Sequence, residues 1–185
     1  RHHNNIVLLR NEQNLGLNAT LNKCLAAAQG EYIARMDGDD ISTPDRFEKE
    51  IEFLMKNPGY AIVSTQMEYF DEQGAYGFSS MEQQPKLNSF VHHTPFCHAP
   101  CMVRKFAYDA VGGYSVDKKL LRAEDYHLWI KMYHSGFKGY NLKEVLYKNV
   151  ILNVMKEKSI NGFELVDEIH IKDDIDIPIS NPIQL

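Results

Sequence analysis

The run Asp37-Gly38-Asp39-Asp40 places three carboxylates within four residues, directly after a segment of strand type. In an extended chain residues i and i+2 point the same way, so Asp37 and Asp39 are expected to converge. Gly38 allows a ligand to approach the backbone between them. Neighbouring carboxylates repel one another unless a cation joins them, and hard oxygen ligands favour Mg²⁺ or Mn²⁺. The run therefore predicts a divalent cation whose remaining ligands are substrate phosphates.

An acidic turn ahead of a helix is the competing interpretation of this run. Asp39 and Asp40 would then cap the helix that follows or complement its dipole, with no chemistry implied. The spacing alone leaves both interpretations open, because acidic turns are common.

A second acidic pair, Glu124-Asp125, opens a segment with helical periodicity. A carboxylate in this place can accept a proton from an attacking sugar hydroxyl and so act as a general base. Favourable interaction with the helix dipole explains the pair equally simply, and without further context that explanation is preferred.

The elements that must position these acids follow from apolar periodicity and turn residues. Strand, helix and strand alternate early in the chain, which is typical of a parallel sheet with crossover helices. Residues 66–100 are expected to be less regular, with a turn at Glu72-Gln73-Gly74. The expected strands are 6–9, 31–36, 61–64, 101–103, 137–141 and 145–152, and the expected helices are 17–28, 44–56, 104–112 and 124–135.

Composition narrows the classes of partner. The segment 164–185 has six acidic residues against one lysine and carries the whole formal net charge of −5. The rest of the chain has no basic stripe, which argues against nucleic acid. There is no apolar run of membrane-spanning length and no signal peptide, so a cytoplasmic protein is expected. The three cysteines, Cys24, Cys97 and Cys101, are expected to be ordinary buried thiols, although Cys97-His98-Ala99-Pro100-Cys101 raises the alternative of zinc.

Several blocks, taken in order and spacing over about residues 6–147, strongly resemble family-2 inverting glycosyltransferases, especially bacterial enzymes of capsule, exopolysaccharide or lipopolysaccharide synthesis. The matching blocks are Asn14-Leu15-Gly16-Leu17, Leu21-Asn22-Lys23, Gly30 through Ser42, Pro44-Asp45-Arg46-Phe47, His98 through Arg104, Gly112-Gly113-Tyr114 and Ala123 through Trp129.

The resemblance implies a GT-A-type α/β fold, a mixed sheet with helices on both faces, and a nucleotide-diphosphate sugar as donor. It implies Mg²⁺ or Mn²⁺ with Asp39 as first ligand and Asp37 and Asp40 beside it. Asn14, Gly16, Asp37 and Asp39 fall at donor-binding positions, and His98 falls in the acceptor-side block. Asp125 is carried over as the catalytic base, with Glu124 in support.

Two departures from the family pattern affect the expected organisation. The opening strand, helix and second strand of the family are missing, so residues 1–152 are expected to be a glycosyltransferase domain without its first βα units. Residues 153–185 are expected to be an acidic C-terminal tail. After Tyr147 the chain reads Lys148-Asn149-Val150, where the family often has an arginine and a histidine near the diphosphate.

The leading functional hypothesis is inverting glycosyl transfer to a glycan or lipid-linked glycan, in the cytoplasm or at the inner face of the membrane with peripheral contact. A catalytically inactive remnant that acts only as a binding module is the alternative. A nucleotidyltransferase is a third class, but it requires a Gly-rich phosphate loop with nearby basic residues, which the sequence lacks.

Overall fold

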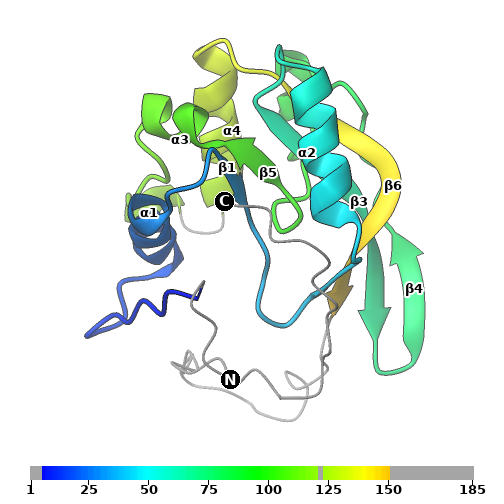
Figure 1. The fold of residues 1–185 in the computed structure, drawn as a ribbon, viewed down its shortest axis with the longest axis horizontal. Helices are drawn as coiled ribbons and strands as arrows, with labels where there is room; N and C mark the ends of the chain where they lie inside the picture. Colours follow the sequence, from blue (N-terminus) through cyan, green and yellow to red (C-terminus); the bar gives the residue numbers. More distant parts are fainter. Residues whose placement is uncertain (1–5, 121–122, 151–185) are drawn as a thin grey trace.

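The computed structural model describes residues 6–120 and 123–150, which contain both helices and strands (Figure 1). The α-helices are α1 (Leu17–Ala27), α2 (Arg46–Lys56), α3 (Lys105–Val111) and α4 (Glu124–His134). The 3₁₀ turns are η1 (Leu87–Val91) and η2 (Lys118–Leu120). The strands are β1 (Tyr32–Ala34), β2 (Ile41–Ser42), β3 (Ile62–Asp71), β4 (Gly74–Phe78), β5 (Met102–Arg104) and β6 (Gly139–Val150).

The strands form one mixed sheet in the order β1-β5-β3-β6-β2, with β4 paired to β3. Only β3 and β6 run parallel, and the other pairs are antiparallel. The expected mixed α/β sheet is therefore confirmed, whereas the parallel sheet expected from the early alternation is wrong. The reason is that β5 lies between β1 and β3 and pairs antiparallel with both.

In the central strands, the side chains of successive residues point to opposite faces of the sheet. Helices cover both of these faces. Ile62 and Val103 pack into a cluster with α3 and α4, whereas their neighbours Val63 and Met102 pack with Leu54 of α2 on the other face. Figure 1 shows α2 crossing in front of the long strands β3 and β6. Two apolar clusters thus hold the sheet between α2 and the α3–α4 pair.

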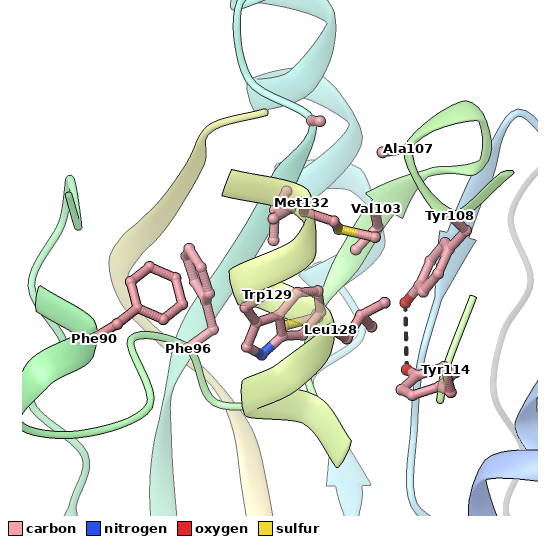
Figure 2. Close-up of a cluster of buried hydrophobic side chains, with 12 residues drawn as sticks. Phe90, Phe96, Val103, Ala107, Tyr108, Tyr114, Leu128, Trp129 and Met132 are labelled. Atoms are coloured by element: carbon pink, nitrogen blue, oxygen red, sulfur yellow. Dashed lines mark hydrogen bonds between the residues drawn. The ribbon is translucent and has the colours of Figure 1, made fainter. Parts of the chain in front are cut away.

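The larger cluster is centred on Trp129, whose side chain is fully buried. In Figure 2 the Trp129 ring lies between Phe96 and Leu128, and the centroids of the Phe96 and Trp129 rings are 5.6 Å apart. Met132 adds to the same stripe one turn further along α4. The helical stripe expected at residues 124–135 is confirmed, and it anchors the helix that begins with Glu124-Asp125.

The strand expected at residues 6–9 does not form, and the segment has no regular structure. No strand of the described sheet pairs with it, since β1 is the edge strand on that side and pairs only with β5. Leu8 is 87% exposed as a result. An apolar run of this length is compatible with a strand, but ladder hydrogen bonds require a partner.

The segment expected to be irregular is partly regular. β3 continues to Asp71 and turns at the predicted place into β4, which extends the sheet as a hairpin. The two strands expected at 137–141 and 145–152 are one strand, β6, whose pairing with β3 shifts register near Gln66. No helix in the part of the chain that the structure describes is long and apolar enough to cross a bilayer. The tail predicted for 153–185 lies outside the described residues.

Candidate active site

The acidic run Asp37–Asp40 forms a tight turn between β1 and β2. The backbone N–H of Asp40 donates a hydrogen bond to the carbonyl of Asp37 over 3.3 Å, which closes the turn. Gly38 and Asp39 occupy its exposed corner. The chain is not extended here, so the geometry from which Asp37 and Asp39 were expected to converge is absent, and their convergence remains a prediction. A turn rotates successive side chains apart, and the three carboxylates reach three different environments.

Asp37 is paired with Arg35. Arg35 Nη2 lies 2.6 Å from Asp37 Oδ1 and Nη1 lies 3.1 Å from Oδ2, which is the bidentate geometry that favours Arg–carboxylate pairs. The Arg35 side chain is only 11% exposed, whereas that of Asp37 is 41% exposed. The backbone N–H of Asp37 also donates to the Tyr147 hydroxyl over 3.0 Å. Asp37 therefore presents a carboxylate whose charge Arg35 already offsets.

Asp40 is turned into the protein and is 7% exposed. Its Oδ1 accepts hydrogen bonds from the backbone N–H of Val150 (2.9 Å) and from Asn149 Nδ2 (3.1 Å), and its Oδ2 lies 3.2 Å from the same amide nitrogen. Both partners belong to the end of β6. The expectation that Asp40 ligates a cation remains a prediction. In this structure its carboxylate accepts hydrogen bonds from the end of β6.

Asp39 is the exposed carboxylate of the turn, and its side chain makes no hydrogen bond or ion pair with the described residues. No group of three or more potential ligand side chains (His, Cys, Asp or Glu) gathers around one point in residues 6–120 and 123–150. A cation held by Asp39 would therefore need most of its oxygen ligands from elsewhere. Mg²⁺ behaves in this way, since it is usually held by one or two carboxylates together with substrate phosphates and water.

Asn14 and Gly16 lie at the start of α1, where the chain enters the helix. The N–H of Gly16 donates to Asn14 Oδ1 over 2.9 Å, and Gly16 adopts a φ of 79°, which favours glycine. Both residues are exposed. The structure thus explains their spacing as a local turn ahead of α1, and their predicted contact with the donor remains a prediction.

His98 joins a chain of buried hydroxyl groups on the α3–α4 face. Its Nε2 lies 2.8 Å from the Tyr114 hydroxyl. Figure 2 shows the next contact of this chain, in which the hydroxyl oxygens of Tyr114 and Tyr108 are 3.5 Å apart. The Trp129 ring meets the imidazole edge-on with centroids 5.8 Å apart. Burial, with a smaller contribution from the charge of Arg35, lowers the pKa of His98 to about 3. A neutral imidazole offers one donor and one acceptor, which suits it to orient a hydroxyl group.

Asp125 occupies the first turn of α4 and is half-buried. Burial raises its pKa, the backbone N–H of Tyr126 lowers it, and the neighbouring Glu124 charge raises it. The net shift is upward, because burial outweighs the backbone hydrogen bonds at the start of the helix. A raised carboxylate pKa suits a general base, which works best when its pKa approaches the working pH.

The charge of Arg35 acts on residues of both acidic regions. Besides binding Asp37, its charge lowers the pKa of His98 and opposes the rise in the pKa of Asp125. Arg35 therefore lies near enough to Asp37, His98 and Asp125 for its charge to act on each, with the smallest contribution among the causes named for Asp125.

Some residues that shape the site were not singled out from the sequence as functional. Asn22 of α1 accepts a hydrogen bond from the backbone N–H of Tyr114 and donates to its carbonyl, both over 2.8 Å. A side chain at Gly113 would place its Cβ 2.5 Å from Asn22 Oδ1, so the close approach requires glycine. Asn22 and Gly113 lie in the matching sequence blocks, but nothing in either block shows that they touch.

A hollow of about 560 Å³ lies between α1, β1 and α2. Its lining is mainly apolar and includes Leu9, Cys24, Ile33, Phe47 and Ile51. None of the predicted site residues lines it, so the chemistry indicated by the acidic residues lies elsewhere on the molecule.

The chain is similar in sequence to a known family and to individual proteins. The sequence profile described as Glycosyl transferase family 2 matches residues 1–112. EpsE of Bacillus subtilis (strain 168), whose name assigns it as a glycosyltransferase, is 45% identical over 143 residues, which is 77% of this chain and 51% of EpsE. A UDP-Gal:alpha-D-GlcNAc-diphosphoundecaprenol beta-1,3-galactosyltransferase of Escherichia coli is 34% identical over 140 residues, covering 73% of this chain and 49% of the enzyme.

A solved structure shares the fold at low sequence identity. The mannosyltransferase PcManGT from Pyrobaculum calidifontis, in complex with GDP-Man and Mn²⁺, superposes with a TM-score of 0.55 at 17% identity, over 77% of this chain and 39% of that one. This likeness confirms the GT-A-type fold. The chain spans about half the length of the relatives it matches.

Proposed function

The chain belongs to glycosyl transferase family 2, and from that premise we propose that it transfers a sugar from a nucleotide-diphosphate donor to an acceptor hydroxyl with inversion. The observation that carries the proposal is that the chain holds two acids in different ways. Asp39 is exposed at the tip of a turn, and Asp125 is half-buried with a raised pKa. One suits a phosphate-bound cation, and the other suits a proton acceptor.

The reaction is divided between these groups. The acceptor hydroxyl attacks the anomeric carbon, and Asp125 takes the proton as the new bond forms. The bond from the anomeric carbon to the diphosphate breaks, and the nucleoside diphosphate leaves from the opposite side, which inverts the centre. Glu124 supports the base by raising its pKa. His98, neutral and held by Tyr114, orients the acceptor hydroxyl.

Asp39 would hold Mg²⁺ or Mn²⁺ together with the donor phosphates, and the cation when bound offsets the negative charge on the departing diphosphate. Asp37, neutralised by Arg35, would accept a hydrogen bond from the donor ribose. Asn14 and Gly16 would approach the nucleotide from the start of α1. A Mn²⁺ and nucleotide-sugar complex of a protein with the same fold supports this part of the proposal.

For the acceptor we propose a lipid-linked or growing surface glycan, handled in the cytoplasm at the inner membrane face. The name of the Escherichia coli relative, which gives a diphosphoundecaprenol-linked sugar as acceptor, supports this class.

A transfer assay tests the proposal. The full-length protein is incubated with Mn²⁺, a panel of UDP- and GDP-sugars and synthetic lipid-diphosphate sugars. Release of a nucleoside diphosphate with formation of a glycoside of inverted anomeric configuration, assigned by NMR, is the expected result. Retained configuration, or release of pyrophosphate in place of nucleoside diphosphate, would refute it. A protein that binds Mn²⁺ and nucleotide but turns over no donor would favour the inactive binding module.

A further inference from the structure

Both ends of the acidic turn are attached to β6. At the first end the backbone N–H of Asp37 donates to the Tyr147 hydroxyl over 3.0 Å. At the second end the Asp40 carboxylate accepts hydrogen bonds from Asn149 and Val150. The attachment continues into β2, which pairs with β6 immediately after the turn. The turn is therefore held by a strand more than one hundred residues away in the sequence.

The Asp40 carboxylate accepts hydrogen bonds from Asn149 and from the N–H of Val150. These bonds are here called the Asp40–β6 contact. A buried charge is tolerated only when it is hydrogen-bonded or paired, and these donors supply that compensation. To ligate a cation, Asp40 would have to do so from a carboxylate that is only 7% exposed and whose two oxygens already accept these bonds. Asp39, one residue earlier, is exposed and makes no such bonds with residues 6–120 or 123–150.

We propose that Asp40 is a positioning residue that fastens the acidic turn to the end of β6 and so orients Asp39, and that it is not itself a cation ligand. The inference rests on the proposed function, because it assigns Asp39 as the residue that holds the cation. It departs from the ligand role that the family resemblance implies for Asp40.

The geometry explains why such fastening matters. Asp39 lies at the corner of the turn next to Gly38, whose backbone is permissive, so nothing at the corner itself fixes the carboxylate. Its position depends on the two ends of the turn, and a displacement of about 1 Å at a reacting site can cost roughly a hundredfold in rate. A hydrogen-bonded carboxylate at the second end supplies the required stiffness.

Three variants of the full-length protein separate positioning from ligation. Asp40→Asn and Asn149→Leu each weaken the Asp40–β6 contact, the first by setting an amide nitrogen against the Asn149 amide and the second by removing the side-chain donor, and only the first removes a carboxylate. The double variant Asp40→Asn/Asn149→Asp exchanges the two groups, so that the amide at 40 donates to the carboxylate at 149 and still accepts from Val150. Asp71→Asn, in the β3–β4 turn, is the matched control because its carboxylate accepts a local backbone bond away from the site.

Mn²⁺ affinity is measured for each variant by electron paramagnetic resonance with Mn²⁺ alone and with Mn²⁺ and UDP. Loss of a group that orients a metal ligand typically weakens metal binding by about 10- to 100-fold. We expect a loss in this range for Asp40→Asn and for Asn149→Leu, recovery of most of the affinity in the exchanged double variant, and no change in the control. Wild-type affinity in Asn149→Leu, or no recovery in the double variant, would overturn the proposal.

Amide hydrogen exchange of the same proteins without metal tests the Asp40–β6 contact independently of cation binding, and so separates this proposal from the proposed function. Both single variants are expected to lose protection at Val150 and at residues 38–41, and the double variant is expected to regain it. If this pattern holds while wild type binds no Mn²⁺, the cation in the proposed function fails and the fastening stands. If protection is unchanged in Asp40→Asn, the fastening itself is refuted.

Discussion

The acidic turn at Asp37–Asp40 and the first turn of α4 carry the two sets of site carboxylates, and they are held in opposite ways. α4 is fixed by apolar packing, since Leu128, Trp129 and Met132 are fully buried one to two turns after Asp125. The acidic turn has almost no apolar support and is fixed by hydrogen bonds to Arg35 and to β6.

This difference suits two chemical tasks. A general base must keep its place relative to one reacting proton, and rigid packing supplies that. A carboxylate that shares a cation with a mobile substrate must remain accessible, and an exposed turn held at its ends provides access. If this comparison is right, changes at the two regions must alter different measured quantities.

The largest expected effect is on turnover, from Asp125→Asn. A general base contributes typically 10²- to 10⁴-fold, so kcat of the full-length enzyme is expected to fall by about that factor. The measurement is initial rate at saturating donor and acceptor. Near-normal turnover in Asp125→Asn together with loss in Glu124→Gln would reverse the two roles, and no effect of either would leave the pair as a helix-dipole feature.

The next effect is on stability and distinguishes the packed region from the turn. Trp129→Ala is expected to lower the free energy of unfolding by about 3–5 kcal/mol, because it leaves a large cavity in the α3–α4 cluster. Asp39→Ala removes an exposed side chain without partners and is expected to change it by no more than about 0.5 kcal/mol. Denaturant titration of both variants tests this, and equal losses would contradict the proposed difference in support.

A smaller effect is expected in the pH dependence. The base must be deprotonated to act, and burial raises the pKa of Asp125, so kcat/KM is expected to fall with decreasing pH at a higher pH than for an ordinary aspartate near 3.9. Glu124 adds to the rise, and Glu124→Gln is therefore expected to move this acidic limb to lower pH. A limb that stays in place in Glu124→Gln but disappears in Asp125→Asn would show that the two charges are not coupled.

The two regions also differ in how far the sequence predicted them. The helix at 124–135 and its buried stripe follow from local periodicity, and the structure has them at the expected residues. The turn was placed correctly after β1, but Asp37 and Asp39 were expected to converge from an extended chain, whereas the structure has a turn whose three carboxylates have different surroundings. The reason is that their environments are set by Arg35, Tyr147, Asn149 and Val150, three of which lie on β6.

Other differences between prediction and structure have the same origin. The run Ile6-Val7-Leu8-Leu9 has strand composition but no neighbour in the described sheet. The packing of Gly113 against Asn22 joins α1 to the turn that carries Tyr114, and no local pattern in either segment indicates it. Elements that depend on nearby residues were predictable, whereas contacts between distant segments were not.

The most direct test of separate roles is nucleotide binding in Asp39→Ala and Asp125→Asn. Isothermal titration of the full-length variants with UDP and with GDP, in the presence and absence of Mn²⁺, measures donor-side affinity without turnover. We expect Asp39→Ala to lose the enhancement that Mn²⁺ gives to nucleotide binding and Asp125→Asn to keep it in full. Unchanged Mn²⁺-dependent binding in Asp39→Ala, or an equal loss in Asp125→Asn, would contradict the division of the site into a cation-binding turn and a packed base.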